Sequence, residues 1–130
     1  MDKTAWIRQN LTEKDTVILN EFDYRIVDYL NYYSDARIAH LTRDDRVTFN
    51  HSHPDIDSIT VDEFVEKYNS GELRLFALDD FLAPSPEIKS CRYGEAKFAA
   101  AENLANRLKD DAVLVNSGTF GATYQIKKSE

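Results

Sequence analysis

The start of one helix is specified more completely than any other element boundary in this 130-residue chain. Thr60 and Glu63 have the spacing of a capping box, in which each side chain accepts a hydrogen bond from the other residue's backbone amide. Ile59 and Phe64 occupy the positions of a hydrophobic staple around that cap. Gly71 predicts the helix end, because glycine takes the left-handed conformation there at little cost. The chain therefore has a helix of defined start, end and buried face near its middle, and the other elements must pack around it.

The apolar pattern on either side of this helix predicts an α+β fold. A short helical turn is expected over residues 4–10, and a longer helix from about Thr12 to Tyr33, where apolar residues recur at three- and four-residue steps. A second long helix is expected from about Arg92 to Lys109, with a broad face of alanine and leucine. Strand character is found in five short runs, residues 37–41, 46–50, 72–78, 112–115 and 122–126. We expect a single compact domain over residues 1–130, with a mixed sheet of four to five strands and two long helices packed on it.

Composition favours a folded cytoplasmic protein. A chain of this length buries roughly two-thirds of its unfolded surface, and a hydrophobic content of 42% argues against disorder. Cys91 is the only cysteine, so no internal disulfide can form, which indicates a reducing compartment. The first residues lack the basic-then-apolar order of a secretory signal, and no apolar run approaches the ~20 residues of a membrane-spanning helix.

The net charge of −7 is concentrated in the middle of the chain. Residues 55–80 contain eight acidic residues and only two basic ones, Lys67 and Arg74. Direct nucleic-acid binding is therefore not expected, because phosphate binding needs clustered lysine and arginine. A partner protein with a basic surface, a metal ion or simple solvation of an acidic face remain as explanations.

Residues 51–57 hold two of the three histidines together with two aspartates. Alternate residues of an extended strand point the same way, so the imidazoles of His51 and His53 could meet one ion. Asp55 or Asp57 could supply a carboxylate oxygen and leave a position for water, as catalytic zinc requires. Manganese accepts the same ligand types. The alternative is a solvated polar loop after a strand.

The four residues His51-Ser52-His53-Pro54 resemble the zinc-binding motif of the JAMM metalloprotease family. That resemblance implies zinc held by His51 and His53, with an aspartate ligand further along the chain. At the matching positions this chain has Phe64 and Val65. The resemblance thus covers four residues, and the chain is not assigned to the family on that basis.

Tyrosine is crowded into one predicted helix, at positions 24, 29, 32 and 33. The apolar stripe of that helix includes Tyr33, whereas Tyr24 and Tyr32 fall outside it or at its margin. Exposed tyrosine beside acidic residues is typical of binding surfaces, since a large ring with few rotors makes contact at low entropic cost. Partial burial with the hydroxyl at the surface is the alternative.

The sequence contains no complete set of catalytic residues. The leading hypothesis is therefore a small acidic protein that binds a partner protein with a basic surface, and inhibition of that partner is one form this binding could take. Chains of this kind are frequent among phage, mobile-element and immunity proteins, which is an analogy of size and composition. No cofactor is expected under this hypothesis. The predicted partner-binding residues are Tyr24, Tyr32, Asp55, Asp57, Asp62, Glu63 and Glu66.

Two alternatives stay open. The first is a metal-dependent hydrolase in which His51, His53 and Asp55 bind zinc or manganese. The second is a structural subunit that forms a homodimer through the tyrosine-bearing helix.

Overall fold

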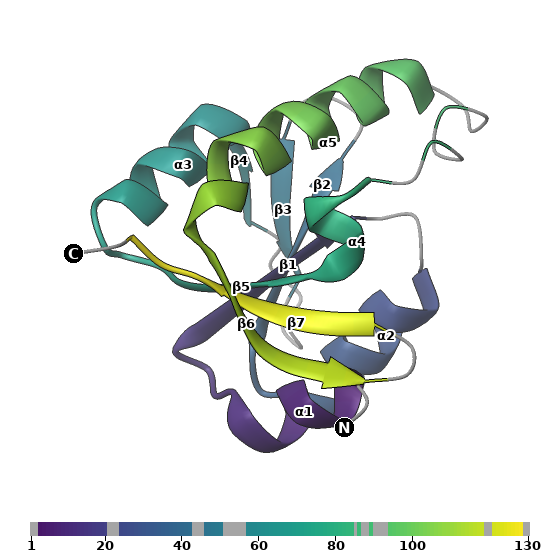
Figure 1. Cartoon of the computed structure of the whole chain (residues 1–130), viewed down its shortest axis with the longest axis vertical. Helices are drawn as coiled ribbons and strands as arrows, with labels where there is room; N and C mark the ends of the chain where they lie inside the picture. The colour runs from purple at the N-terminus through teal and green to yellow at the C-terminus, as the bar shows by residue number, and fades with distance from the viewer. Residues whose placement is uncertain are drawn as a thin grey trace.

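In the residues described by the computed structural model, seven strands form one mixed sheet with helices on both of its faces (Figure 1). Those residues are 3–20, 24–42, 46–50, 57–84, 86, 89, 94–118 and 121–128. The helices are α1 (Lys3–Asn10), α2 (Tyr24–Tyr33), α3 (Val61–Asn69), α4 (Asp79–Leu82), α5 (Gly94–Leu108) and the short 3-10 helix η2 (Lys109–Asp111). The strands are β1 (Asp15–Asn20), β2 (Arg37–Thr42), β3 (Arg46–Asn50), β4 (Asp57–Thr60), β5 (Arg74–Leu78), β6 (Ala112–Gly118) and β7 (Gly121–Ile126).

Three parallel strands lie at the centre of this sheet. The strand order is β4-β3-β2-β1-β5-β7-β6. Strand β1 pairs in parallel with β2 on one side and with β5 on the other, whereas the outer strands pair antiparallel. The centre of the sheet is therefore closed to water at both edges, and its two faces must be covered by helices.

Each face of the sheet carries its own apolar core. On one face, helices α1 and α2 cover a cluster that includes Ile7, Leu30 and Val17. On the other face, helices α3, α4 and α5 cover a larger cluster that includes Phe64, Phe81 and Leu104. Helices α2 and α3 consequently lie on opposite sides of the sheet, as Figure 1 shows.

The helix predicted from the capping box is confirmed as α3. The Glu63 amide donates to Thr60 Oγ1 at 3.1 Å, and the Thr60 amide donates to Glu63 Oε1 at 3.3 Å. Ile59 and Phe64 pack in the same core cluster, as a staple requires. Gly71 has a φ of +84°, in the left-handed region predicted for it.

The predicted helix from Thr12 to Tyr33 is wrong over its first half. Residues 15–20 form strand β1, and only the second half is helical, as α2. Val17, Ile18 and Leu19 are all completely buried, so this apolar run belongs to a central strand with both faces covered. Thr12 and Asp15 close a turn at the start of this strand, since the Thr12 amide donates to Asp15 Oδ2 at 2.8 Å and the Asp15 amide donates to the Thr12 carbonyl at 3.0 Å.

The α+β class and the mixed sheet are confirmed, but the predicted counts are wrong. The described residues hold seven strands where four to five were expected. Helix α5 spans 15 residues, whereas α2 spans only 10. The strand runs predicted at 37–41 and 46–50 pair antiparallel as β2–β3, and those at 112–115 and 122–126 pair antiparallel as β6–β7. The missed strands are β1, taken for helix, and the four-residue β4, which is too short to show a pattern.

Replacing Phe64 by alanine should lower the free energy of unfolding by about 3–5 kcal/mol. The Phe64 ring is fully buried and lies 5.9 Å from the ring of Phe49, between centroids. Urea unfolding measures the loss, with Val113→Ala on the exposed edge strand as the control, expected to stay within about 0.5 kcal/mol. A similar small effect for both variants would contradict the assignment of Phe64 to the core.

Candidate functional site

Three tyrosine rings of α2 contact one another in a row at the surface. The rings of Tyr29 and Tyr33 have centroids 4.8 Å apart, and those of Tyr32 and Tyr33 are 4.9 Å apart at an interplanar angle of 64°. Tyr32 is 82% exposed and Tyr33 is 55% exposed. These three residues are here called the tyrosine cluster. Their rings form a continuous aromatic surface that is exposed to solvent at Tyr32 and Tyr33.

The cluster is anchored from beneath and from one side. Leu30 is buried in the core between the sheet and α2, and Tyr29 packs partly against the same core. Helix α1 packs on α2, and the Nη1 of Arg8 in α1 lies 3.4 Å from the Tyr29 hydroxyl oxygen, to which it donates. The rings thus stand on a fixed part of the fold.

The sequence pattern predicts that Tyr33 lies on the buried stripe of α2. This prediction is wrong, because Tyr33 is 55% exposed. Tyr33 is the last residue of the helix, and the Ser34 amide closes the final turn by donating to the Leu30 carbonyl at 3.0 Å. The side chain therefore lies where the helix ends. Tyr32 is exposed as predicted. Tyr24 begins α2, and its side chain lies outside the described part of the chain.

The residues near the Tyr32 end of the cluster are acidic, so this surface would attract a positively charged group. Asp28, one turn before Tyr32, and Asp35, just beyond the helix, are both exposed. The last turn of α2 contains no basic residue to offset the partial negative charge of its carbonyl groups.

The predicted acidic residues of α3 are placed differently. Asp62 pairs with Arg107 of α5, with Oδ1 and Nη1 2.7 Å apart, and the Glu63 carboxylate accepts the cap amide of Thr60. Glu66 is exposed. Two of these three carboxylates have partners within the molecule, and all three lie on the opposite side of the sheet from the tyrosine cluster. The tyrosines and these acids do not form one continuous surface.

The histidine segment that was predicted to bind metal falls outside the described part of the chain. His51, His53 and Asp55 lie outside the described residues, and Asp57 begins β4 with its side chain outside them as well. His40, which is described, is buried in β2 opposite Thr48 of β3, as expected for a residue at the edge of the core. Within the described part of the chain, no group of three or more metal-ligating side chains is found.

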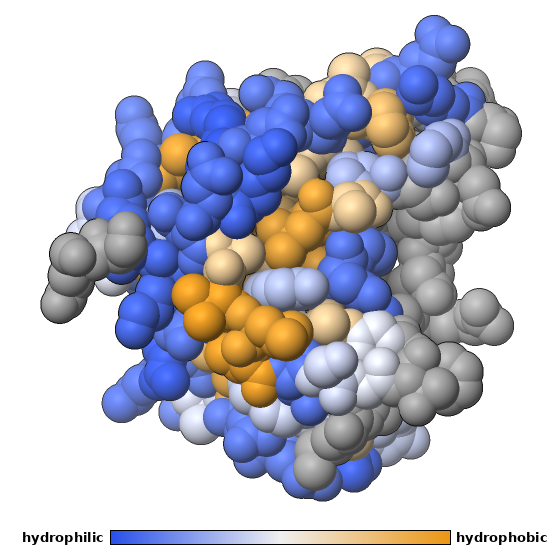
Figure 2. Space-filling view, in the orientation of Figure 1, coloured by the Kyte–Doolittle hydropathy of each residue, from blue (hydrophilic) through white to orange (hydrophobic). Residues whose placement is uncertain are grey.

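A second apolar surface lies over β6, at the edge of the sheet. Val113 is 51% exposed and Leu114 is 54% exposed, and Figure 2 shows an apolar patch over this strand among hydrophilic residues. The register between β6 and β7 shifts between Leu114 and Asn116, which marks a β-bulge. A bulge interrupts the regular row of backbone groups that a further strand would need, so this edge is poorly suited to strand addition.

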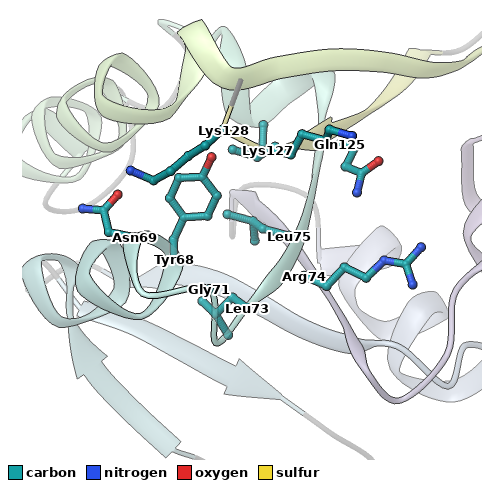
Figure 3. Close-up of a pocket in the computed structure, with 10 residues that line it drawn as sticks. Tyr68, Asn69, Gly71, Leu73, Arg74, Leu75, Gln125, Lys127 and Lys128 are labelled. Atoms are coloured by element: carbon teal, nitrogen blue, oxygen red, sulfur yellow. The ribbon is translucent and has the colours of Figure 1, made fainter. Parts of the chain in front are cut away.

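A shallow hollow of about 330 Å³ lies between the end of α3, the start of β5 and the end of β7 (Figure 3). Tyr68 lines it, and the Tyr68 hydroxyl donates to Asp111 Oδ2 at 2.7 Å. Burial, together with this hydrogen bond, raises the pKa of Tyr68 well above its usual value, so the hydroxyl stays protonated. The hollow is at the lower limit of the size of small-molecule sites.

Two of the three cations that line this hollow, Lys128 and Arg74, point in different directions. The Lys128 amine lies 5.7 Å from the centre of the Tyr68 ring, on one side of the hollow. Arg74 points away from Tyr68 in Figure 3, and its Nε pairs with Asp15 Oδ1 at 3.1 Å. A single anionic group would therefore not contact both charges, and the hollow is a weaker candidate than the tyrosine cluster.

An ion pair lies just beyond the carboxyl end of the parallel strand β5, and ligands bind at this end of many open sheets. After β1 the chain enters α2 on one face, and after β5 it enters α4 on the other face. There the Lys3 amine lies 3.2 Å from Asp79 Oδ1. Gly121 is so close that an added Cβ would lie 2.8 Å from Asp79 Oδ2. In the described residues, the charged groups of Lys3 and Asp79 thus occupy the space beside the carboxyl end of β5.

Comparisons with protein-family models, with curated proteins and with solved structures found no match for this chain. A function for this protein is therefore inferred from the positions and chemistry of its own side chains. Among the helices described, none combines the length and the apolar composition needed to cross a membrane.

Gly121→Ala should destabilise the protein more than Gly71→Ala. Both glycines have positive φ, 137° at Gly121 and 84° at Gly71, so alanine is strained at either position, at a cost of roughly 1–2 kcal/mol. At Gly71 the added methyl group meets open space, whereas at Gly121 it would push on the Asp79–Lys3 ion pair. Thermal or urea unfolding of the two variants gives the comparison. Adding Asp79→Ala should reduce the cost of Gly121→Ala, and equal costs with and without it would refute the close contact.

The metal alternative predicts that protein purified without chelator retains close to one equivalent of zinc or manganese. His53→Ala should abolish this retention and lower the melting temperature, because a ligand that binds only the native state stabilises it. Elemental analysis of the protein measures the metal, and the buried His40 provides the control histidine, since His40→Asn should leave the metal content unchanged. Metal-free protein whose stability does not respond to added zinc would end this alternative.

Proposed function

We propose that this protein acts by binding a partner protein through the tyrosine cluster of α2. The observation that carries the proposal is that Tyr32 is 82% exposed while its ring is in contact with the ring of Tyr33. A large ring held in one position in water loses little further entropy on binding, and aromatic residues are enriched in interfaces for this reason. In this role the protein would inhibit a partner by occupying its surface.

The other two surfaces support this role less well. The exposed residues of β6 lie beside a bulge that disfavours strand addition. The carboxylates of Asp62 and Glu63 on α3 are engaged in an ion pair and in a helix cap. Within the tyrosine cluster, Tyr29 packs on the core, whereas Tyr32 and Tyr33 are exposed and the contacts given for them in the described residues are those among the rings.

A partner of opposite charge fits this surface better than a second copy of the chain. Asp28 and Asp35 lie beside the cluster, and the whole chain has a net charge of −7. A two-fold contact between two α2 helices would bring both pairs of carboxylates into one interface, which is unfavourable. A basic partner surface would instead be attracted at long range, and added salt should slow its association.

The proposal predicts that Tyr32→Ala weakens binding of a captured partner at least about fivefold, which corresponds to a loss of about 1 kcal/mol. Most of the change should appear in the dissociation rate, because buried aromatic anchors determine the residence time. The partner is isolated by capture from host lysate and then measured in purified form by surface plasmon resonance.

Two variants locate the contact. Leu114→Ala removes an exposed apolar side chain from the β6 patch and so tests that surface. The charge reversal Asp62→Lys/Glu66→Lys tests α3. Both should leave the affinity within about twofold if α2 is the site. Loss of binding in either of them, with Tyr32→Ala unchanged, would move the site away from α2. Sedimentation at the same concentrations separates partner binding from homodimerisation.

A further inference from the structure

From the geometry of the tyrosine cluster, we infer that the partner contributes an arginine side chain, whose guanidinium group lies over the ring of Tyr32 and pairs with Asp28. This inference rests on the proposed function, because it names the chemical group that the same surface recognises. It goes beyond a general preference for basic partners, since it distinguishes arginine from lysine.

The first step is the placement of the carboxylate and the ring. Asp28 and Tyr32 are four residues apart in α2, so their side chains lie on the same side of the helix, one turn from each other. Both are exposed. A planar cation lying over the Tyr32 ring therefore has the Asp28 carboxylate within reach, and ring and carboxylate form two parts of one recognition surface.

The second step is the electrostatic character of the helix end. The carbonyl groups of the last turn of α2 carry partial negative charge, and that turn contains no lysine, arginine or histidine. Asp35 follows the helix and is exposed. Asp28, Asp35 and the helix terminus are thus three sources of negative potential near Tyr32, while Arg8 contacts the cluster at Tyr29. This arrangement is complementary to a cation.

The chemistry of the two basic side chains favours arginine over lysine at this surface. A guanidinium group is planar, stacks on aromatic rings and is less strongly hydrated than an ammonium group, so it loses less on leaving water for a ring face. It can also donate to a carboxylate while it stays stacked on the ring. The molecule already contains a guanidinium beside this cluster, since Arg8 Nη1 donates to the Tyr29 hydroxyl at 3.4 Å. The Tyr32 end of the cluster is the end that a partner's arginine would occupy.

The test uses the full chain and three capped pentapeptides that differ only in their central residue: arginine, lysine or citrulline. Citrulline keeps the planar shape of arginine but lacks its charge. Binding is followed by NMR on the tyrosine ring signals, with Tyr32→Phe identifying the signals of Tyr32. The arginine peptide should give saturable shifts of these signals. The lysine peptide should bind more weakly, and the citrulline peptide should give no saturable shift.

Matched variants show whether the named groups are responsible. Tyr32→Ala and Asp28→Asn should each weaken the arginine peptide roughly two- to fivefold, the range expected for an exposed cation–π contact. Tyr32→Phe keeps the ring face and should retain binding. Asp110→Asn removes an equal charge from η2, which packs against α5 and β7, and should have no effect.

Several results would overturn the inference. Equal shifts with the arginine and citrulline peptides, equal affinity for arginine and lysine, or equal losses in Asp28→Asn and Asp110→Asn would each do so. These results are distinct from failure of the proposed function, which is measured on the captured partner. If Tyr32→Ala releases that partner while the peptides do not discriminate, the cluster binds a partner through contacts other than arginine. If Tyr32→Ala leaves the partner bound, both the proposed function and this inference fail.

Discussion

The complete burial of strand β1 is the constraint on which the rest of this fold depends. Val17, Ile18 and Leu19 are inaccessible to solvent, so β1 must have neighbours on both edges and cover on both faces. Parallel pairing with β2 and β5 closes the edges. Since parallel neighbours cannot be joined by tight turns, the connections become crossovers that contain α2 and α3 and supply the cover. The two helices are therefore placed on opposite faces as a consequence of how β1 is buried.

The same constraint explains which parts of the fold could be predicted from the sequence. Helix α3 was predictable because its cap, staple and terminal glycine are local signals, each made by residues near one another in the chain. Strand β1 was not, because an apolar run that is buried on all sides has the same composition in a central strand and in a buried helix. The four-residue step from Ile18 to Phe22 continued the apparent helix across a boundary that only the pairing with β2 and β5 reveals.

The candidate site was predictable in a similar, partial way. Exposure of Tyr32 follows from its position off the apolar stripe, and the structure confirms it. The participation of Tyr33 could not be read from that stripe, because its exposure depends on the helix ending at that residue. The acidic count of residues 55–80 was a poorer guide, since it cannot distinguish a free carboxylate from one engaged by Arg107 or by the cap at Thr60. His51, His53 and Asp55, outside the described residues, stay a sequence-based prediction.

The position of the tyrosine cluster links the burial of β1 to the proposed role in binding. Helix α2 follows β1 and leads to β2, so one side of it must pack on the sheet, and Leu30 does this. The residues on its other side are not needed for that packing, and Tyr32 and Asp28 lie there, one turn apart. Because the backbone beneath them is held by the buried parallel strands, their spacing is set before any partner arrives. In the proposed interaction the backbone of α2 would therefore need little further ordering, and such preorganisation lowers the entropy cost of binding.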